Sequence, residues 1–283
     1  YTCYVTDNRR VLEGVVTLRE LLGAEDDRRV EELMSTDIIT ALTTEDQEEA
    51  VQRIMKYDFI SLPVVDQEGR LVGVVTVDDV MDVMEEEATE DIEKMAAIVP
   101  TDKSYFQTGV VETWLHRIPW LLLLMVSATF TGTILGIFED ALAANAVLTL
   151  FIPMLMDTGG NSGSQASVTV IRAMSLGDVE FRDIFRVVWK ELRVALLCAM
   201  TLGVVVYAKV IFLDRKGPLV ALVVALTIIV TIILAKLVGC LLPMLAKRLG
   251  FDPAVMASPF ITTVVDALSL LVYFAVATQL LGL

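Results

Sequence analysis

The sequence is 283 residues long, carries a formal net charge of −15 at pH 7, and becomes strongly apolar near residue 115, which favours two domains. All of the net negative charge comes from the first third, because residues 1–103 hold 26 acidic side chains against 10 basic ones. A segment this acidic repels phosphate, which argues against nucleic acid as a partner and leaves a solvated surface or the binding of divalent cations.

The acidic part contains an internal repeat. Residues 3–22 and 63–82 each read as a strand, a polar turn, a second strand ending in Val-Val-Thr, and the start of a helix. Gly14 corresponds to Gly73, an offset of 59 residues. The repeat predicts a pair of small α+β modules, and the first module is expected to lack its opening half.

Two helices are predicted between the repeated segments. One covers residues 26–34, and the other covers residues 44–56 with Thr43 or Thr44 as its N-cap. Apolar residues at helical spacing in the second segment indicate a face that packs on the strands.

The repeat resembles the cystathionine-beta-synthase (CBS) domain, whose tandem pairs form regulatory units that often bind adenosine nucleotides. The Gly-h-h-Thr-x-x-Asp signature of that domain is met by Gly73, Thr76 and Asp79, whereas the first copy has Glu20 in the acidic position. The resemblance implies ATP as a ligand, contacted by Thr76 and Phe59. The alternative is that Thr76 and Asp79 only cap the helix that follows.

Five apolar runs follow the acidic part, and each exceeds the about 20 residues that a helix needs to cross the hydrocarbon core of a bilayer. Backbone amides find no water at that depth, so helices are the expected form. The runs cover residues 118–138, 146–173, 187–213, 218–246 and 258–282.

Basic residues beside the runs predict the orientation of the chain. Five basic side chains lie in or beside the connection between the second and third runs, and Lys247 and Arg248 follow the fourth run. The acidic domain meets the membrane at Arg117 on the same side. The positive-inside rule therefore predicts a cytoplasmic acidic domain and a C-terminus outside the cell.

The last run contains an acid, Asp266. An ionised Asp at the bilayer centre costs on the order of 2.5 to 3.5 kcal/mol, so it is expected to face a partner or a watery path. Thr262 and Ser258 lie one and two turns before Asp266, respectively, on the same helical face. Two alternatives are that the hydroxyls bond to carbonyls within their own helix, and that Asp266 pairs with Lys236.

The second run contains the polar stretch PMLMDTGGNSGSQASVTVIR at residues 153–172. Pro153 and the Gly159–Gly160 pair are expected to break the helix and free carbonyl groups, which is tolerated only beside water or buried in protein. With Asn161, Ser164 and Gln165, these carbonyls would offer oxygen atoms to a hard cation, and Mg²⁺ fits a site with few acids. The alternative is that Gly159, Gly160 and Gly163 let helices approach closely.

Taken together, these features resemble the MgtE family of magnesium channels. The resemblance rests on the CBS pair, an acidic connecting helix, five spans, the Pro-x₅-Gly-Gly-Asn-x-Gly-x-Gln pattern at residues 153–165, and Asp-Pro-Ala at residues 252–254. Members of this family carry an acidic N-terminal helical domain before the CBS pair, and that domain is expected to be absent here.

The resemblance implies a homodimer with one pore on its two-fold axis. Asp266 of both chains would meet a largely hydrated Mg²⁺ ion in that pore. The residues that the resemblance places around the ion are Asp266, Asn161, Gly160, Ser164, Ser258 and Thr262.

The resemblance also implies regulation by Mg²⁺ in the cytosol. Residues 85–91 would begin a long helix that plugs the pore, and acids of that helix and of the second CBS module would bind the regulatory ions. These acids are Asp46, Glu48, Asp58, Asp79, Asp82, Glu87, Glu90 and Asp91. The alternative for each is a solvated surface charge, and Asp46 and Glu48 also fit the first turn of a helix.

The expected architecture is a cytosolic α+β CBS-domain pair with an incomplete first copy, joined by a long acidic connecting (plug) helix to an α-helical membrane domain of five transmembrane helices. The expected domains are residues 1–34, 35–84, 85–114 and 115–283.

The expected function is a Mg²⁺-selective channel in the plasma membrane that imports Mg²⁺ and is closed by cytosolic Mg²⁺. Alternatives are a coupled secondary transporter of divalent metal, a CBS-linked anion channel, or a sensor that transports nothing. Catalysis is not expected, because the one histidine, His116, lies at the membrane boundary and the three cysteines show no metal-site spacing.

Overall fold

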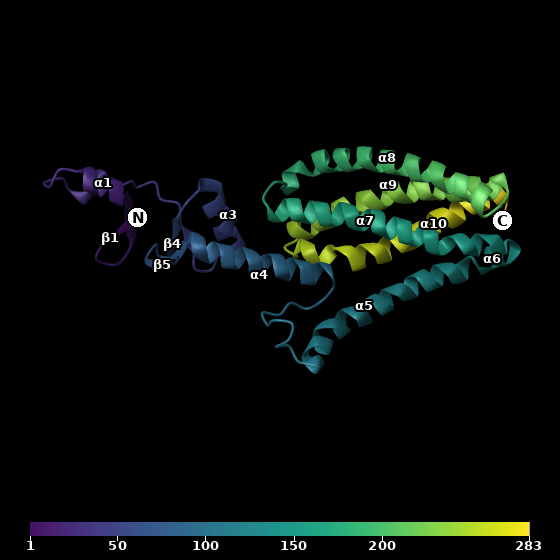
Figure 1. Cartoon of the computed structure of the whole chain (residues 1–283), viewed down its shortest axis with the longest axis horizontal. Coiled ribbons are helices and arrows are strands. Elements are labelled where there is room, and N and C mark those ends of the chain that lie inside the picture. Colours follow the sequence, from purple (N-terminus) through teal and green to yellow (C-terminus); the bar gives the residue numbers. More distant parts are fainter. Residues whose placement is uncertain (283) are drawn as a thin grey trace. The chain divides into compact units, whose positions relative to one another are not determined.

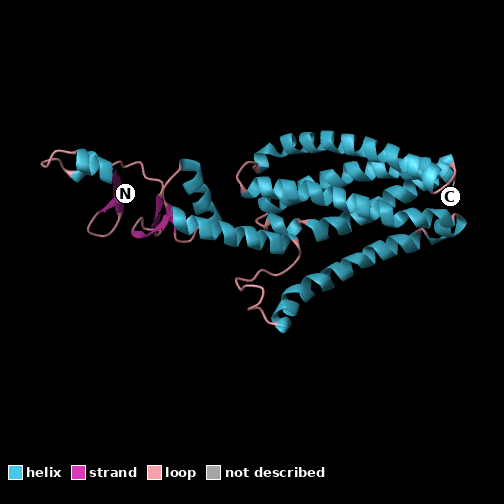
Figure 2. Ribbon diagram, viewed as in Figure 1, coloured by secondary structure: helices cyan, strands magenta, loops and turns pink. Residues whose placement is uncertain are grey.

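The computed structural model describes residues 1–282, except for the side chain of Ser258. The chain divides into two compact units, Tyr1–Thr89 and Glu90–Leu283, which are described separately (Figure 1). Strands occur in the first unit, whereas the described part of the second unit contains helices and loops (Figure 2).

The first unit contains two small sheets. An antiparallel hairpin of β1 and β2 forms one sheet, and the other has the order β3-β4-β5, with β3 parallel and β5 antiparallel to β4. Tyr4 joins the two sheets through a hydrogen bond of 2.9 Å between its hydroxyl group and that of Ser61. The strands are β1 (Thr2–Thr6), β2 (Leu12–Thr17), β3 (Ala41–Leu42), β4 (Ser61–Val65) and β5 (Leu71–Thr76).

Each hairpin of the first unit leads directly into a helix, which confirms the predicted repeat. The helices are α1 (Leu18–Gly23), α2 (Val30–Leu33), α3 (Gln47–Tyr57) and α4 (Val77–Met95). A core of five buried side chains lies between α3, α4 and the second sheet, and consists of Ala41, Val51, Ile54, Leu62 and Val80.

Three local predictions for the soluble part were wrong. The predicted helix over residues 26–34 is a single turn, Val30–Leu33, because none of its side chains is buried to hold a longer helix in place. The cap of α3 is neither Thr43 nor Thr44 but Asp46, whose carboxylate accepts a hydrogen bond of 2.9 Å from the Glu48 amide. The connecting helix expected over 85–114 is interrupted between Met95 and Val110.

The second unit is built from long helices. The region Ala146–Phe151 is a 3-10 helix that leads into α7, and the last turn after α8 is a π-helix at Lys209–Leu213. The α-helices are α5 (Val110–Ile137), α6 (Glu139–Ala144), α7 (Ile152–Ser175), α8 (Ile184–Ala208), α9 (Pro218–Arg248) and α10 (Ser258–Leu281).

Among the described residues, four helical segments are long and apolar enough to cross a membrane. These segments are Val110–Ile137, Phe181–Leu213, Pro218–Arg248 and Pro253–Leu281. Four of the five predicted spans therefore have the required length and hydropathy. The other, α7, has 24 residues but is not among the four, and its sequence contains the polar stretch described above.

The core of the second unit surrounds α9. This helix packs against α7 and α8, and α10 packs against both α7 and α9 (Figure 1). A buried cluster that includes Leu155, Ile228 and Phe274 fills the space between them, and the Tyr273 hydroxyl donates a hydrogen bond of 2.9 Å to the Leu148 carbonyl. By contrast, α5 buries none of its side chains.

The prediction that Pro153 and Gly159–Gly160 break the second span was wrong. Pro153 lies in the first turn of α7, where proline is tolerated, and the helix continues through both glycines. The glycines instead allow close packing: a Cβ atom at Gly159 would lie 2.7 Å from Thr231 Cγ2, and one at Gly163 would lie 2.8 Å from Ile261 Cγ2. The alternative of close helix approach is therefore confirmed, and the freed carbonyl ligands are withdrawn.

The tightest of these contacts yields a test of the fold. A Cβ atom at Gly239 of α9 would overlap the Gly163 carbonyl oxygen of α7, and a backbone atom cannot rotate away. We expect Gly239→Ala to destabilise the second unit by about 1 to 3 kcal/mol, as overpacked cores do. The midpoint of thermal unfolding in detergent, followed by size-exclusion chromatography, measures this loss.

The matched control is Gly132→Ala in α5. No atom lies within 4 Å of the position that its Cβ would take, so the unfolding midpoint should stay at or above that of the unsubstituted protein. Equal midpoints for Gly239→Ala and the unsubstituted protein would contradict the packing described here.

Candidate functional site

A stripe of polar side chains runs along the outer face of α7. Its members recur every three or four residues, so they share one face of the helix, and all are exposed in the single chain. The opposite face is buried against α9 and α10. The stripe consists of Asp157, Asn161, Gln165, Thr169 and Arg172.

Asp266 lies beside this stripe on α10. A Cβ atom at Gly160 of α7 would lie 3.0 Å from Thr262 Cγ2, so the two helices touch one turn away from Asp266. The carboxylate of Asp157 is near enough to that of Asp266 for an unfavourable electrostatic interaction. The structure thus brings together two acids from neighbouring helices.

Asp157 was missed in the sequence analysis. The available signal was its position four residues before Asn161, which puts both on one helical face of the second apolar run. The expected break at Gly159–Gly160 hid that signal, because Asp157 and Asn161 lie on one face only if the helix is continuous through the glycines.

The other residues predicted for the membrane site occupy different places. Asn161 and Ser164 line an open groove on α7, described below. The Thr262 hydroxyl donates a hydrogen bond of 2.9 Å to the Pro259 carbonyl, so the alternative of bonding within the helix holds for this residue. The side chain of Ser258 lies outside the described part of the chain.

The groove beside the stripe has a volume of about 840 Å³. Three helices line it, namely α7, α8 and α9, with two buried charged side chains, Glu191 and Lys236. In the described part of the chain Lys236 forms no ion pair with Asp266, so that alternative is not supported. The lining residues are Asn161, Ser164, Gln165, Ala166, Val168, Thr169, Glu191, Val194 and Lys236.

In the first unit, several of the predicted acids serve the ends of helices. The Asp79 carboxylate accepts hydrogen bonds from the Thr76 hydroxyl (2.6 Å) and the Thr76 amide (2.8 Å), which hold the pKa of Asp79 below its usual range. Glu20 makes the same contacts with Thr17 in the first copy. The capping alternative therefore describes Thr76 and Asp79, and Phe59 packs against the core of the unit.

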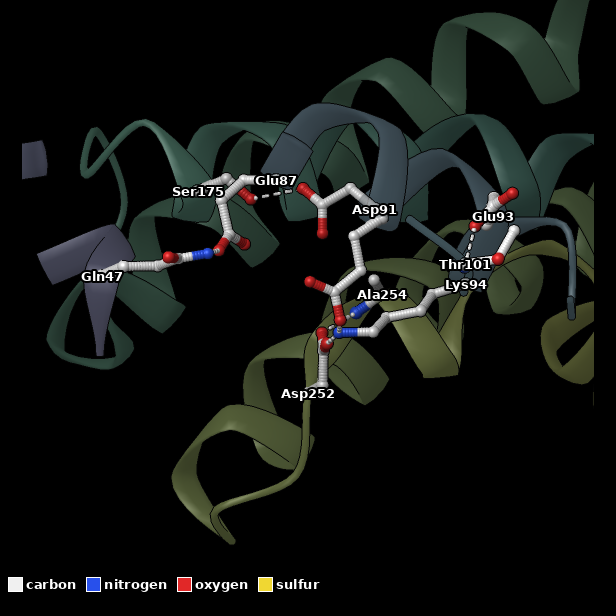
Figure 3. Close-up of polar contacts among 10 residues, drawn as sticks. Gln47, Glu87, Asp91, Glu93, Lys94, Thr101, Ser175, Asp252 and Ala254 are labelled. Carbon is white, nitrogen blue, oxygen red and sulfur yellow. Dashed lines mark hydrogen bonds and ion pairs between the residues drawn. The ribbon is translucent and has the colours of Figure 1, made fainter. Parts of the chain in front are cut away.

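The remaining predicted acids of the first unit are spread over α3 and α4. Asp58 ends α3 in a left-handed conformation with φ of 53°, and Asp82 is exposed on α4. The Glu87 carboxylate accepts a hydrogen bond of 2.7 Å from the Gln47 side chain (Figure 3). Among residues 1–282, no three acidic, His or Cys side chains come together as a metal site.

The last turns of α4 belong to the second unit and contact it through polar groups (Figure 3). The Lys94 ammonium donates a hydrogen bond of 2.6 Å to the Asp252 carboxylate and also forms an ion pair with Glu90. The Ser175 hydroxyl donates a bond of 3.1 Å to the Asp91 carboxylate. Burial, followed by the charge of Asp252, raises the pKa of Asp91 above its usual value, although the Ser175 bond opposes this.

The donor types present suit a hydrated hard cation. Asp157 and Asp266 form a pair of acids, and amide and hydroxyl oxygens follow Asp157 along α7, whereas Glu90 and Asp252 are both occupied by the Lys94 ammonium. Mg²⁺ keeps several waters and needs only one or two carboxylates, whereas a dry calcium site takes six to eight oxygen ligands. The residues present fit a hydrated Mg²⁺ ion better than a dry calcium site.

Comparisons with known proteins agree with this chemistry. Residues 152–276 match the family model of MgtE, described as a divalent cation transporter, and residues 30–86 match that of the CBS domain. Magnesium transporter MgtE of Thermus thermophilus is 43% identical over 281 residues, which is 99% of this chain and 62% of the relative. Magnesium transporter MgtE of Bacillus subtilis is 37% identical over 276 residues, which is 97% of this chain and 60% of the relative.

The chain spans about three-fifths of the length of these relatives. Among solved structures, the cytosolic domain of the Mg²⁺ channel MgtE in complex with ATP is 51% identical over 29% of this chain and 34% of that chain, with a TM-score of 0.29. The CBS domain is thus followed by a region, from α7 to most of α10, that matches the transporter family model. The similarity to the two relatives extends over nearly the whole chain. The chain thus contains a CBS domain followed by a domain of the MgtE family of divalent cation transporters.

Proposed function

We propose that two copies of this chain form a Mg²⁺-selective channel that imports Mg²⁺ across the plasma membrane, with the pore on the two-fold axis. The observation that carries the proposal is the polar stripe exposed on the outer face of α7, with the half-buried Asp266 beside it. Lipid cannot satisfy these groups, so the stripe requires water or a second polar surface. A second copy related by a two-fold axis supplies both.

In this proposal the five long helices α5, α7, α8, α9 and α10 each cross the membrane. The CBS domain lies in the cytoplasm and the C-terminus lies outside. The basic residues that follow α7 and α9 support this orientation. An inside-negative potential then drives a divalent cation inward with about 4.6 kcal/mol per 100 mV.

Asp266 of the two chains would hold Mg²⁺ through its water shell. The residues that surround this position in the proposal are Asn161 and Ser164 of α7, Gly160 as the point where α7 meets α10, and Thr262 and Ser258 on the face of Asp266. Carboxylates that face each other across water attract a divalent ion without stripping its waters, which suits an ion that dehydrates reluctantly. Selectivity among divalent ions would then depend on the size and strength of the water shell.

A coupled secondary transporter is less well supported. The sequence feature that favoured it was the broken second span, since discontinuous helices are common in alternating-access transporters. Because α7 is continuous, that reason no longer applies.

Asp266 gives the direct test of the channel. We expect Asp266→Asn and Asp266→Ala to abolish Mg²⁺ entry into proteoliposomes, read with an internal Mg²⁺-sensitive dye, because either change removes the carboxylate that compensates the ion's charge. Both variants should elute like the unsubstituted protein on size exclusion. Normal Mg²⁺ entry through Asp266→Ala would remove the pore assignment.

The matched control is Asp140→Asn, which changes an exposed acid of α6 away from the stripe and should leave Mg²⁺ entry unchanged. Single-channel steps that need neither a proton nor a sodium gradient would separate the channel from a coupled transporter.

Gating by internal Mg²⁺ is the second part of the proposal. Close pairs of like charges repel by roughly 4 kcal/mol at an effective dielectric constant near 20, and bound Mg²⁺ offsets this repulsion. High internal Mg²⁺ would favour the compact, closed arrangement, and low internal Mg²⁺ would favour opening. The acids proposed to bind the regulatory ions are Asp46, Glu48, Asp58, Asp79, Asp82, Glu87, Glu90 and Asp91.

ATP is proposed as a ligand of the CBS domain, at Thr76 and Phe59. The support is the sequence identity of 51% to the ATP-bound cytosolic domain over the matched region. The capping contact of Thr76 with Asp79 leaves the other side of the hydroxyl oxygen as an acceptor.

Lys94 tests the gating proposal, because its ammonium ties the end of α4 to Asp252. We expect Lys94→Gln to weaken that contact, so that closure requires more internal Mg²⁺, whereas Lys94→Arg, which keeps the charge, should stay near the normal threshold. Patch recording across a range of internal Mg²⁺ concentrations measures the threshold.

The control is Lys103→Gln, which removes an exposed ion pair with Glu112 and should leave the threshold unchanged. A threshold that is the same for Lys94→Gln and the unsubstituted protein would show that the α4 contact plays no part in closure.

A further inference from the structure

Two buried charges line the groove between α7, α8 and α9. Glu191 is 8% exposed and Lys236 is 4% exposed, and neither forms a hydrogen bond or an ion pair within the described part of the chain. Both act electrostatically on the thiol of Cys240, one helical turn from Lys236, so the two charges lie in the same region of the unit. The charged atoms of both side chains open onto the groove rather than into a closed interior, and charges at this depth need water or a counter-charge, which the groove must supply.

The rest of the lining is rich in oxygen donors. Asn161, Ser164, Gln165 and Thr169 all come from α7, and with Glu191 they present amide, hydroxyl and carboxylate oxygens. The one cationic group is Lys236. Three of these polar residues, Asn161, Gln165 and Thr169, also belong to the stripe beside Asp266, so the groove is continuous with the proposed path of the ion.

We propose that this groove is a second, weak binding site for a hydrated divalent cation. The Glu191 carboxylate attracts the cation, and the Lys236 ammonium repels it and so speeds its release. This inference rests on the proposed channel function, since the ion would reach the groove after Asp266. The groove extends along α7 from Asn161 towards Arg172, which is the direction of the cytoplasm in the proposed orientation.

The opposite charges give the site its character. Glu191 and the α7 oxygens attract the ion's water shell, while the Lys236 ammonium repels the ion. Conduction requires a site that binds strongly enough to admit an ion and weakly enough to release it. A groove with Glu191 alone would hold a divalent cation longer, and a groove with Lys236 alone would exclude it.

This proposal predicts changes of opposite sign for two substitutions. Glu191→Gln should raise the external Mg²⁺ concentration that gives half-maximal entry, and Lys236→Gln should lower it and also slow the maximal rate. Each shift should be roughly fivefold, the size expected when one unit charge that acts on a divalent ion through water is removed. Mg²⁺ entry into proteoliposomes at graded external Mg²⁺ measures both quantities.

A binding readout without transport completes the test. In detergent, added Mg²⁺ should raise the midpoint of thermal unfolding of each protein. The increase should be smaller for Glu191→Gln, and larger for Lys236→Gln, than for the unsubstituted protein. Lys190→Gln is the control, since this exposed lysine of α8 precedes Glu191 but does not line the groove, and both readouts should be unchanged.

Three outcomes would overturn the site. One is a shift of both variants in the same direction, which is the mark of a merely structural role. Another is no shift in either readout. The third is loss of a co-purified anionic phospholipid from Lys236→Gln, seen by native mass spectrometry, with Mg²⁺ dependence unchanged, which would assign the groove to a lipid headgroup.

Failure of the channel itself is distinguishable from failure of the groove. Normal Mg²⁺ entry through Asp266→Ala would overturn the channel, whatever the groove variants do. If Asp266→Ala abolishes entry while Glu191→Gln and Lys236→Gln behave like the unsubstituted protein, the channel stands and the groove site falls.

Discussion

The close contact of α7 with α9 and α10 is the constraint on which the rest of the second unit depends. Glycines at the inner face of α7 leave no room for side chains there, and Gly163 and Gly239 bring two backbones into contact. The rotation of α7 about its axis is thereby fixed. Since the inner face admits only small or apolar groups, the acid, amides and hydroxyl of the same helix must face outward, beside Asp266.

The buried position of α9 follows from the same contact. Half of its most apolar stretch is buried within the single chain, and among the described helices α9 alone packs extensively against α7, α8 and α10. Lys236 is buried within this helix, and its side chain lines the polar groove beside α7. A single packing arrangement thus orients both the stripe and the buried lysine.

The sequence allowed the long helices and the repeat to be predicted, because both depend on local pattern. Apolar runs of the length of a bilayer and strand-turn-strand-helix repeats are visible residue by residue. What could not be predicted was the path of α7 through Gly159 and Gly160. Each glycine costs a helix only about 1 kcal/mol relative to alanine, and close packing offsets that cost, but packing is a property of three helices together. For the same reason Asp157 and Glu191 gave no sign of what they face.

The contrast between α5 and α9 bears on how freely each helix can vary in evolution. None of the side chains of α5 is buried within the chain, and only its last turns, at Ile134 and Leu135, pack against the described core, so along most of the helix no neighbouring shape in its own subunit selects among Leu, Val, Ile and Phe. Substitutions of one apolar residue by another are then tolerated in α5 as long as the helix stays hydrophobic enough to insert into the bilayer. In α9 the same exchanges would change the packing of a buried core. Related sequences should therefore diverge faster along α5, where only hydrophobicity is required, than along α9.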